Sequence, residues 1–351
     1  MNYYETDLYK AELSDILSTN ESFEILKNKV IVITGARGLI GSELIETILY
    51  ANEKYDLNCK IYGIVRNVEA AKERFKQYKN SNDLYLIQAD INKDRIPIDE
   101  EIDYFIHGAS NTHPMYYSTR PIETILTNTI GTNHVLEFAS KHECKRFLFL
   151  SSVEIYGENK GDVDKFTEDY LGYIDSNTLR AGYPEGKRLG ETLCQAYIKE
   201  KNLDCVIPRI SRAYGPGILK EDSKALSQFI QKAVNKEDIV LKSKGTQLYS
   251  YIYAADVVSA ILFLMEHGET GEVYNLAGVE SDVTLADLAN YIAQTAGTKV
   301  IFNIPDEIES AGYSKATKAL MDTTKIKKLG WHSQYSIKDG IRRTLAMHEM
   351  K

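Results

Sequence analysis

The sequence predicts an α/β fold built on a parallel, doubly wound sheet, with a smaller lobe formed by the C-terminal part of the chain. Three observations predict this fold. Short apolar runs rich in β-branched residues recur over the first 210 residues, helical patterns lie between several of them, and a glycine-rich turn follows the first run. Runs that are apolar throughout are typical of strands buried on both faces, and their alternation with helices is typical of a parallel sheet.

The first strand is expected at residues 29–35, where KVIVITG ends in a glycine. Five comparable runs follow it, at 60–65, 84–90, 103–110, 146–152 and 204–211. Helical patterns separate several of these runs, at 38–52, 128–142 and 184–202. We therefore expect repeated strand–helix units over residues 27–212, which form the main domain.

After residue 212 the alternation becomes looser. Helices are expected at 222–237, 254–268 and 284–297, with short strands at 238–243 and 272–278. Residues 213–351 are therefore expected to form mainly a second lobe, with segments that return to the main domain. Residues 1–26 precede the first strand and are expected to form a helical extension.

The composition argues against several classes of function. Of the 351 residues 43% are hydrophobic and 26% are charged, which suffices for a globular core. The net charge of −8 does not suit a nucleic-acid-binding protein, and no apolar run is long enough to span a membrane. The four cysteines show no CxxC pair and no metal-ligand spacing. We therefore expect a cytoplasmic protein with free thiols and no metal site.

The glycine-rich turn GARGLIGSE lies between the first strand and the first helix of the main domain. Gly35, Gly38 and Gly41 leave the backbone open to a pyrophosphate, which would sit on the positive N-terminus of the helix. Leu39 and Ile40 belong to the same turn. This arrangement predicts a Rossmann-type domain that binds a dinucleotide.

The end of the second strand bears on the choice between NAD and NADP. An acidic residue there would bind the ribose 2′-hydroxyl of NAD, but Arg66 occupies the place and Arg37 lies within the glycine turn. Two guanidinium groups favour the 2′-phosphate of NADP(H). NAD(H) stays possible, because Arg66 could simply stack on the adenine.

Six motifs occur in order along the chain: GARGLIGS, HGAS, NTIGTNHVLE, SSVEIYG, YPEGK and AYGPG. With these motifs the sequence resembles the extended short-chain dehydrogenase/reductases, in the NAD(P)-dependent nucleotide-sugar epimerase/dehydratase branch. The resemblance runs from about residue 28 to residue 331. It implies that the C-terminal lobe binds substrate.

Tyr183 and Lys187 lie one helical turn apart, with Pro184 in the first turn of the helix. A phenol with a pKa near ~10 is a poor base at neutral pH. A nearby ammonium and a positive nicotinamide would lower that pKa. The resemblance assigns Tyr183 as the acid/base and implies that both residues also contact the cofactor.

The resemblance also implies roles for two residues that follow the fifth strand. Ser152 would hydrogen-bond the reacting sugar oxygen, and Glu154 would act near C5 and C6 of the sugar. Glu154 could serve elimination, decarboxylation or 5-epimerisation, or only orient the substrate. Val153 stands where many 4,6-dehydratases carry an acid.

Further site residues are implied by the resemblance alone. Cofactor contacts are implied for Asp90 and Ile91 at the adenine, for His107, Gly108 and Ala109 beneath the cofactor, for Asn128 bracing the catalytic lysine, and for Pro208 and Arg209 beside the nicotinamide. Substrate contacts are implied for Ser110, Thr112, His113 and Asn275.

Two departures from the family pattern concern the substrate. Arg212 replaces an asparagine that often contacts a sugar diphosphate, and Tyr249 occupies the place of a diphosphate-binding arginine. We expect Arg212 to supply the missing positive charge from the other side of the cleft.

The function expected from these residues and the resemblance is modification of a nucleotide-activated sugar through a 4-keto intermediate, by an epimerase, 4,6-dehydratase or decarboxylase. An NADPH-consuming 4-keto-sugar reductase is the alternative, and a non-catalytic cofactor-sensing protein is the third hypothesis. The resemblance also implies a homodimer formed by the helices that carry Asn128 and Tyr183.

Overall fold

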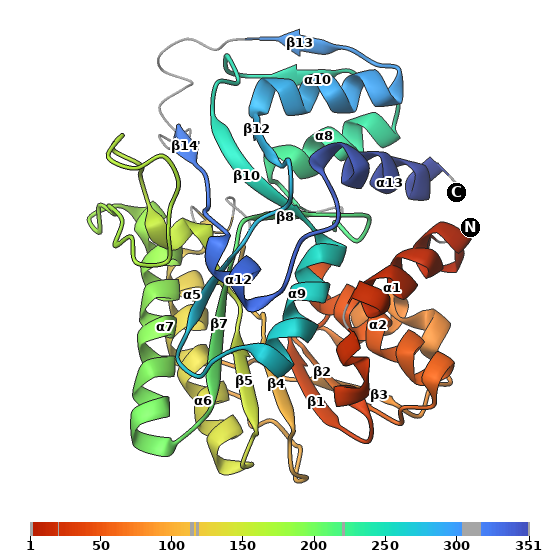
Figure 1. The fold of residues 1–351 in the computed structure, drawn as a ribbon, viewed down its shortest axis with the longest axis vertical. Coiled ribbons are helices and arrows are strands. Elements are labelled where there is room, and N and C mark those ends of the chain that lie inside the picture. Colours follow the sequence, from red (N-terminus) through yellow and green to blue (C-terminus); the bar gives the residue numbers. More distant parts are fainter. Residues whose placement is uncertain are drawn as a thin grey trace.

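The computed structural model describes residues 3–19, 21–112, 116, 119–219, 222–303 and 317–349, and its centre is a single parallel sheet (Figure 1). The strand order is β11-β7-β5-β4-β1-β2-β3, with β6 paired to β7. Every pairing in this sheet is parallel. The strands are β1 (Val30–Thr34), β2 (Lys60–Val65), β3 (Leu84–Gln88), β4 (Tyr104–His107), β5 (Arg146–Phe149), β6 (Ser151–Ser152), β7 (Cys205–Ile210) and β11 (Val273–Leu276). The predicted fold class is confirmed.

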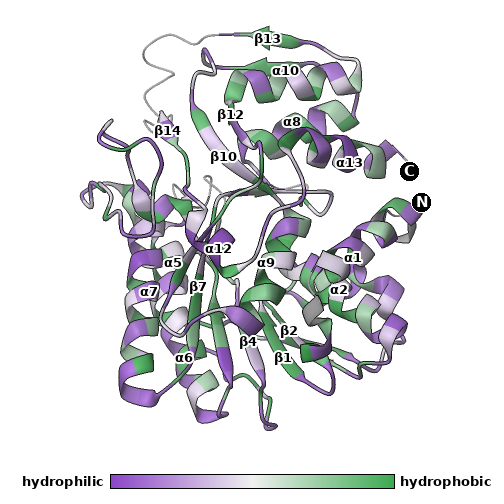
Figure 2. Cartoon of the chain, viewed as in Figure 1, coloured by the Kyte–Doolittle hydropathy of each residue, from purple (hydrophilic) through white to green (hydrophobic). Residues whose placement is uncertain are grey.

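Helices cover both faces of the sheet, and the side chains of each strand divide between two cores. Ile31 and Ile33 of β1 face one core and Val32 faces the other, because successive strand residues point to opposite faces. The first core is covered by α2 (Leu39–Tyr55), α3 (Val68–Arg74) and α9 (Ala254–His267). The second is covered by α6 (Thr132–Lys141) and α7 (Gly182–Lys201). Figure 2 shows the hydrophobic residues concentrated along the central strands.

A π-helical segment, η4 (Thr127–Gly131), joins α5 (Pro121–Leu126) to α6. Single turns of 3-10 helix occur elsewhere along the chain. They are η1 (Tyr3–Glu5), η2 (Glu21–Leu26), η3 (Lys76–Tyr78), η5 (Val153–Tyr156) and η6 (Leu179–Ala181). Within the described residues, no helix combines the length and the apolar character that crossing a bilayer would require.

The C-terminal lobe is built on a four-stranded sheet and a separate strand pair. The sheet holds β8 (Arg212–Tyr214), β10 (Leu248–Tyr253), β12 (Asp282–Thr284) and β14 (Lys318–Ala319), and β9 (Ile239–Leu241) pairs with β13 (Val300–Phe302). Its helices are α8 (Ala225–Val234), α10 (Leu285–Ala296), α12 (Thr324–Leu329) and α13 (Ile337–Glu349). Two segments of this part of the chain belong to the main domain (Figure 1). Helix α9 packs on the main sheet, and β11 is one of its strands.

The N-terminal helix α1 (Asp7–Thr19) packs against α2, α9 and α13 and carries a buried acid. The fully buried Glu12 accepts a hydrogen bond of 2.8 Å from the Tyr253 hydroxyl and lies 3.7 Å from Arg343 of α13. Because burial disfavours the charged form, it raises the pKa of Glu12 to about 8. Glu12 therefore connects the extension to the C-terminal lobe in its protonated form at neutral pH.

Replacement of Glu12 by glutamine is expected to flatten the pH dependence of stability. In the unfolded chain a glutamate ionises near pH ~4.3, whereas folded Glu12 keeps its proton until about pH 8. The folded state thus binds more protons between these values, and the wild type loses stability as pH rises through this window, by about 1.4 kcal/mol per pH unit at most. Urea denaturation of wild type and Glu12→Gln between pH 5 and pH 8 measures the difference. Asp7→Asn, an exposed change on the same helix, is the control; equal slopes for wild type and Glu12→Gln would contradict the prediction.

Candidate active site

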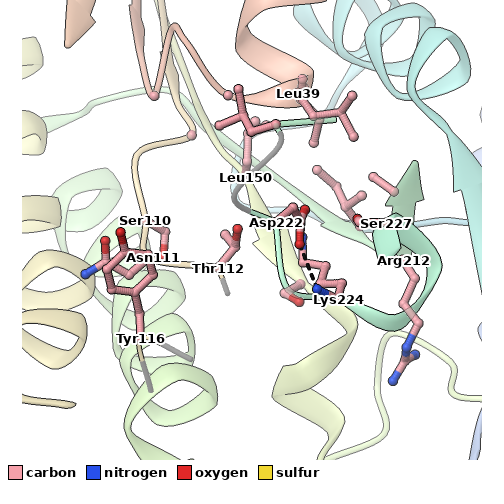
Figure 3. A pocket seen from close by; sticks show the side chains of 18 of the residues that line it. Leu39, Ser110, Asn111, Thr112, Tyr116, Leu150, Arg212, Asp222, Lys224 and Ser227 are labelled. Atoms are coloured by element: carbon pink, nitrogen blue, oxygen red, sulfur yellow. Dashed lines mark hydrogen bonds and ion pairs between the residues drawn. The ribbon is translucent and has the colours of Figure 1, made fainter. Parts of the chain in front are cut away.

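A cavity of about 950 Å³ lies at the carboxyl ends of the parallel strands and extends into the C-terminal lobe. Ligands of open α/β sheets bind at this edge. Its lining runs from the glycine turn past Ser152 and Tyr183 to Ser227 and Lys242. Figure 3 shows Asn111 and Tyr116 on one side of the cavity and Arg212 on the other.

The glycine turn fits a pyrophosphate. Gly35 has a positive φ of +71°, and a Cβ there would lie 2.7 Å from the carbonyl carbon of Gly108. A Cβ at Gly41 would lie 2.5 Å from the Gly35 carbonyl oxygen. The helix α2 begins just after Gly38 without a side-chain cap, so the N–H groups of its first turn are left for a ligand. The backbone can therefore approach an anion closely at the positive end of a helix.

The part of the cavity beside the end of β2 carries an ion pair that the sequence did not predict. Arg66 and Asn111 line this part, together with Asp90, Ile91 and Ala109. The Arg66 guanidinium lies 2.5 Å from a carboxylate oxygen of Glu123 on α5 and donates to the Asn111 side-chain oxygen at 3.2 Å. Of the two guanidinium groups on which the expectation of NADP(H) rested, that of Arg66 is therefore paired with a carboxylate.

Tyr183 and Lys187 lie at the start of α7 and both line the cavity although they are almost fully buried. The Tyr183 phenol is hydrogen-bonded to Ser152, which ends β6. The Lys187 ammonium donates to the Leu150 carbonyl at 2.8 Å and lies 4.7 Å from the centre of the Phe149 ring. Tyr183 and Ser152 thus meet at the carboxyl edge of the sheet.

The electrostatics of Tyr183 differ from the sequence-based expectation. Burial raises the pKa of Tyr183 above its ordinary value, and the Ser152 hydrogen bond opposes this only in part. Burial also lowers the pKa of Lys187 to about 8. The sequence-based prediction counted the charge of a nicotinamide together with that of Lys187, so it stays a prediction. In this structure desolvation dominates, and Tyr183 is a neutral phenol.

Glu154 is flanked by two arginines. Its carboxylate oxygens lie 3.5 Å from Arg180 and 3.5 Å from Arg212. The Arg212 guanidinium stacks on the Tyr249 ring at 3.6 Å, and its Nη1 is buried without a hydrogen-bond partner among the described residues. All four side chains line the cavity, so two positive groups stand beside the Ser152–Tyr183 pair.

Most residues named from the sequence line this one cavity. They are Gly35, Arg37, Gly38, Leu39, Ile40, Gly41, Arg66, Asp90, Ile91, Gly108, Ala109, Ser110, Thr112, Ser152, Glu154, Tyr183, Lys187, Arg212 and Tyr249. His107, Asn128, Pro208, Arg209 and Asn275 are not among its lining residues. His113 lies outside the described residues.

Two of the residues outside the lining hold secondary structure together. His107 is buried between the hydroxyls of Thr34 at 2.7 Å and Thr132 at 3.2 Å. Burial lowers the pKa of His107 well below its ordinary value, so the ring is neutral. Asn128 accepts from the Ser110 hydroxyl at 2.8 Å, which orients a residue of the cavity wall.

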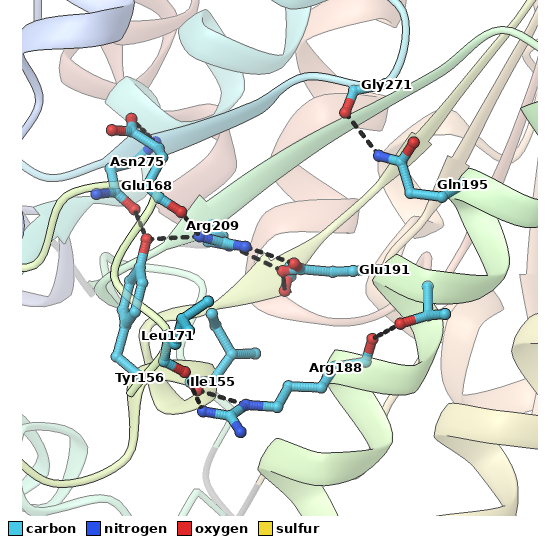
Figure 4. Close-up of polar contacts among 12 residues, drawn as sticks. Ile155, Tyr156, Glu168, Leu171, Arg188, Glu191, Gln195, Arg209, Gly271 and Asn275 are labelled. Carbon is cyan, nitrogen blue, oxygen red and sulfur yellow. Dashed lines mark hydrogen bonds and ion pairs between the residues drawn. The ribbon is translucent and has the colours of Figure 1, made fainter. Parts of the chain in front are cut away.

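Arg209 and Asn275 belong to a polar network beside the cavity (Figure 4). Arg209 makes a two-pronged ion pair with Glu191, at 3.0 and 2.7 Å, and donates to the Tyr156 hydroxyl at 2.9 Å. The Tyr156 hydroxyl in turn donates to the Asn275 side-chain oxygen at 2.7 Å. The network links β7, α7 and β11, so both residues have structural contacts where the sequence suggested ligand contacts.

Sequence reasoning missed two parts of the cavity. Arg180 was missed, although its place three residues before Tyr183 could have indicated that it lies at the same site. The wall contributed by the C-terminal lobe had no motif that could mark it. It includes Lys224, Ser227, Gln228, Lys242 and Gln247.

The model of the NAD dependent epimerase/dehydratase family matches residues 31–277, which include the glycine turn, Ser152, Tyr183 and Lys187. The chain belongs to this epimerase/dehydratase family. UDP-glucuronic acid decarboxylase 6 of Arabidopsis thaliana is 30% identical over 321 residues, which cover 90% of this chain and 87% of that protein.

Solved structures of the epimerase/dehydratase family have the same fold. UDP-glucuronic acid 4-epimerase of Bacillus cereus, in complex with UDP-glucuronic acid and NAD, superposes with a TM-score of 0.76 at 21% identity, covering 92% of this chain and 99% of that one. dTDP-glucose 4,6-dehydratase of Bacillus anthracis, in complex with NAD, has a TM-score of 0.74 at 21% identity and covers 92% and 97%.

Proposed function

We propose that this epimerase/dehydratase oxidises a nucleotide-linked sugar at C4, and that the sugar carries a C6 carboxylate which leaves as CO₂. The observation that carries the proposal is the pair of guanidinium groups, Arg180 and Arg212, beside Ser152 and Tyr183. Arginine suits carboxylate recognition because its planar fork donates two parallel hydrogen bonds. A neutral hexose offers no anion at C6 for these groups.

Tyr183 and Ser152 carry the proton chemistry at C4. A bound nicotinamide dinucleotide supplies the hydride acceptor and donor for C4, and its positive charge favours the phenolate of Tyr183. The Tyr183 oxygen takes the proton of the C4 hydroxyl, while the Ser152 hydroxyl hydrogen-bonds to the same sugar oxygen. When C4 is reduced again, Tyr183 returns the proton to that oxygen.

Arg180, Arg212 and Glu154 act at C5 and C6. The two arginines hold the C6 carboxylate beside the C4 ketone. The C5–C6 bond then breaks, its electron pair forms the C4 enolate, and CO₂ departs. C5 takes up one proton from solvent as the enolate collapses, and Glu154, which lies between the arginines, is assigned the relay of that proton. The relatives named UDP-glucuronic acid decarboxylases support both the uronic acid and the loss of CO₂.

Product analysis tests the proposal. Purified protein is incubated separately with UDP-glucuronic acid and UDP-glucose, with either dinucleotide, and the products are identified by mass spectrometry and NMR. We expect a UDP-pentose and CO₂ from the first substrate and no product from the second. Loss of water from UDP-glucose, or epimerisation of UDP-glucuronic acid without loss of CO₂, would overturn the decarboxylase assignment.

Arg212→Ala is expected to weaken substrate affinity about 10- to 100-fold, because one charge-assisted hydrogen-bond donor in a desolvated site is removed. The buried Nη1, which has no hydrogen-bond partner among the described residues, and the stacking on Tyr249 support this role. Calorimetric titration with UDP-glucuronic acid measures the effect. Arg342→Ala, which removes an exposed arginine paired with Asp339, is the control. Unchanged affinity in Arg212→Ala would contradict this role.

The finer cofactor, partner and compartment assignments are also proposals. Arg37 and Arg66 in the lining gave the sequence-based expectation of NADP(H), but Arg66 is paired with Glu123, and the solved structures named above contain NAD. Four free cysteines support a cytoplasmic location.

A homodimer is supported by an apolar surface on α5, η4 and α7, where Ile122, Ile130 and Leu189 are exposed. Sedimentation velocity, which gives the mass of the particle, tests the dimer.

A further inference from the structure

The second strand of the main sheet ends without the acidic residue that NAD-binding domains use to bind the ribose 2′-hydroxyl. A carboxylate nevertheless reaches this place from a different element. Glu123 of α5 lies 57 residues further along the chain and contacts Arg66, which lines the cavity, from outside the lining itself. A sequence motif defined by the end of the second strand does not include residues of α5, so it could not indicate this acid.

The contacts of Glu123 hold it in this position. One carboxylate oxygen lies 2.5 Å from the Arg66 guanidinium and 3.4 Å from the Asn111 side-chain nitrogen. The other lies 3.5 Å from Arg120. Asn111 is buried, so it fixes the pair from the cavity side. Arg66 is thereby held by two polar partners, Glu123 and Asn111, at a site where it would otherwise be free to bind an anion.

The pair changes the electrostatics of the ribose subsite. A 2′-phosphate carries between one and two negative charges near neutral pH, and to bind Arg66 it must either displace Glu123 or lie close to a like charge. A ribose with a free 2′-hydroxyl carries no charge and meets no such repulsion. Arg66 alone would favour the phosphate, but Glu123 occupies its guanidinium and offsets its charge.

We infer that Glu123 is a specificity-determining residue that occupies the Arg66 guanidinium and thereby favours NAD(H) over NADP(H). The inference rests on the dinucleotide binding of the proposed function and deepens it. It also gives Arg66 a different role, as the partner of Glu123, from the 2′-phosphate contact that the sequence alone predicted.

The test compares the dissociation constants of NAD⁺ and NADP⁺ by isothermal titration calorimetry on the full chain freed of bound cofactor. Wild type is expected to bind NAD⁺ more tightly. Glu123→Gln is expected to raise NADP⁺ affinity about tenfold, because Arg66 gains a phosphate partner by a partly exposed charge-assisted bond, while NAD⁺ affinity changes little. The double variant Glu123→Gln/Arg66→Ala is expected to lose this gain.

Glu69→Gln is the matched control, because it removes an equal charge from the exposed Glu69–Lys72 pair on α3. It is expected to leave the ratio of the two affinities unchanged. An unchanged ratio in Glu123→Gln, or an equal shift in Glu69→Gln, would overturn the inference. Failure of wild type to bind either dinucleotide would instead overturn the proposed function on which the inference rests.

Discussion

Tyr183→Phe is expected to lower kcat by about 10²- to 10⁴-fold, the usual contribution of a positioned acid/base. The substitution removes only the phenolic oxygen that meets Ser152 at the sheet edge, and the ring keeps its buried place. Other tyrosines line the cavity, but the hydrogen bond to Ser152 is made by Tyr183. Turnover of the nucleotide sugar, followed by mass spectrometry, measures the loss.

The affinity for the dinucleotide is expected to stay within a few-fold in this variant, because the glycine turn and Lys187 are intact. Tyr197→Phe makes the same change on the exposed part of α7, where the hydroxyl contacts Asn133 and Glu137, and is expected to keep full turnover. If Tyr183→Phe kept turnover close to that of wild type, the assignment of the reaction centre would be wrong.

Arg209→Leu is expected to lower the free energy of unfolding by about 3–5 kcal/mol, the cost of leaving one partner of a buried ion pair uncompensated. The side chains of Arg209 and Glu191 are only 10% and 12% exposed, and their two-pronged contact ties β7 to α7 (Figure 4). Without the guanidinium, the Glu191 carboxylate is left buried with a hydrogen bond from Ser151 at 2.5 Å. Urea denaturation gives the loss.

The double variant Arg209→Leu/Glu191→Leu separates a structural role from a cofactor role. It is expected to be more stable than Arg209→Leu, because neither charge is left without a partner. Dinucleotide affinity is expected to be close to wild type in the double variant, since neither residue lines the cavity. A large loss of dinucleotide affinity at wild-type stability would show instead that Arg209 contacts the cofactor.

The sequence predicted the sheet and the glycine turn because local patterns determine both. An apolar run such as that of β1 can be satisfied only inside a covered sheet, and the glycines that follow it suit one kind of turn. The strand predicted at 146–152 is divided in the structure into β5 and β6, which places Ser152 at the edge. The N-terminal helix was expected, but its buried Glu12 was not, because burial depends on distant partners such as Tyr253.

At the site, the sequence could not indicate the direction of a side chain that can point to either face. Arg209 lies on β7 near the reaction centre, yet it points to Glu191 and away from the cavity. His107 likewise ends a strand at the cavity edge and turns into the interior between two hydroxyls. The position of each residue along the chain was informative. The face that its side chain takes depends on partners many residues away.

By itself, then, the sequence determined the class of fold, the phosphate turn and the Ser152–Tyr183–Lys187 set, since each depends on spacing within one strand, turn or helix. The tertiary structure alone decided that Tyr183 is a neutral phenol, that Arg180 joins Arg212 at Glu154, and that Glu123 pairs with Arg66. The reason is physical: desolvation and ion pairing depend on which groups the packed elements bring within a few ångströms, and no local pattern records those distances.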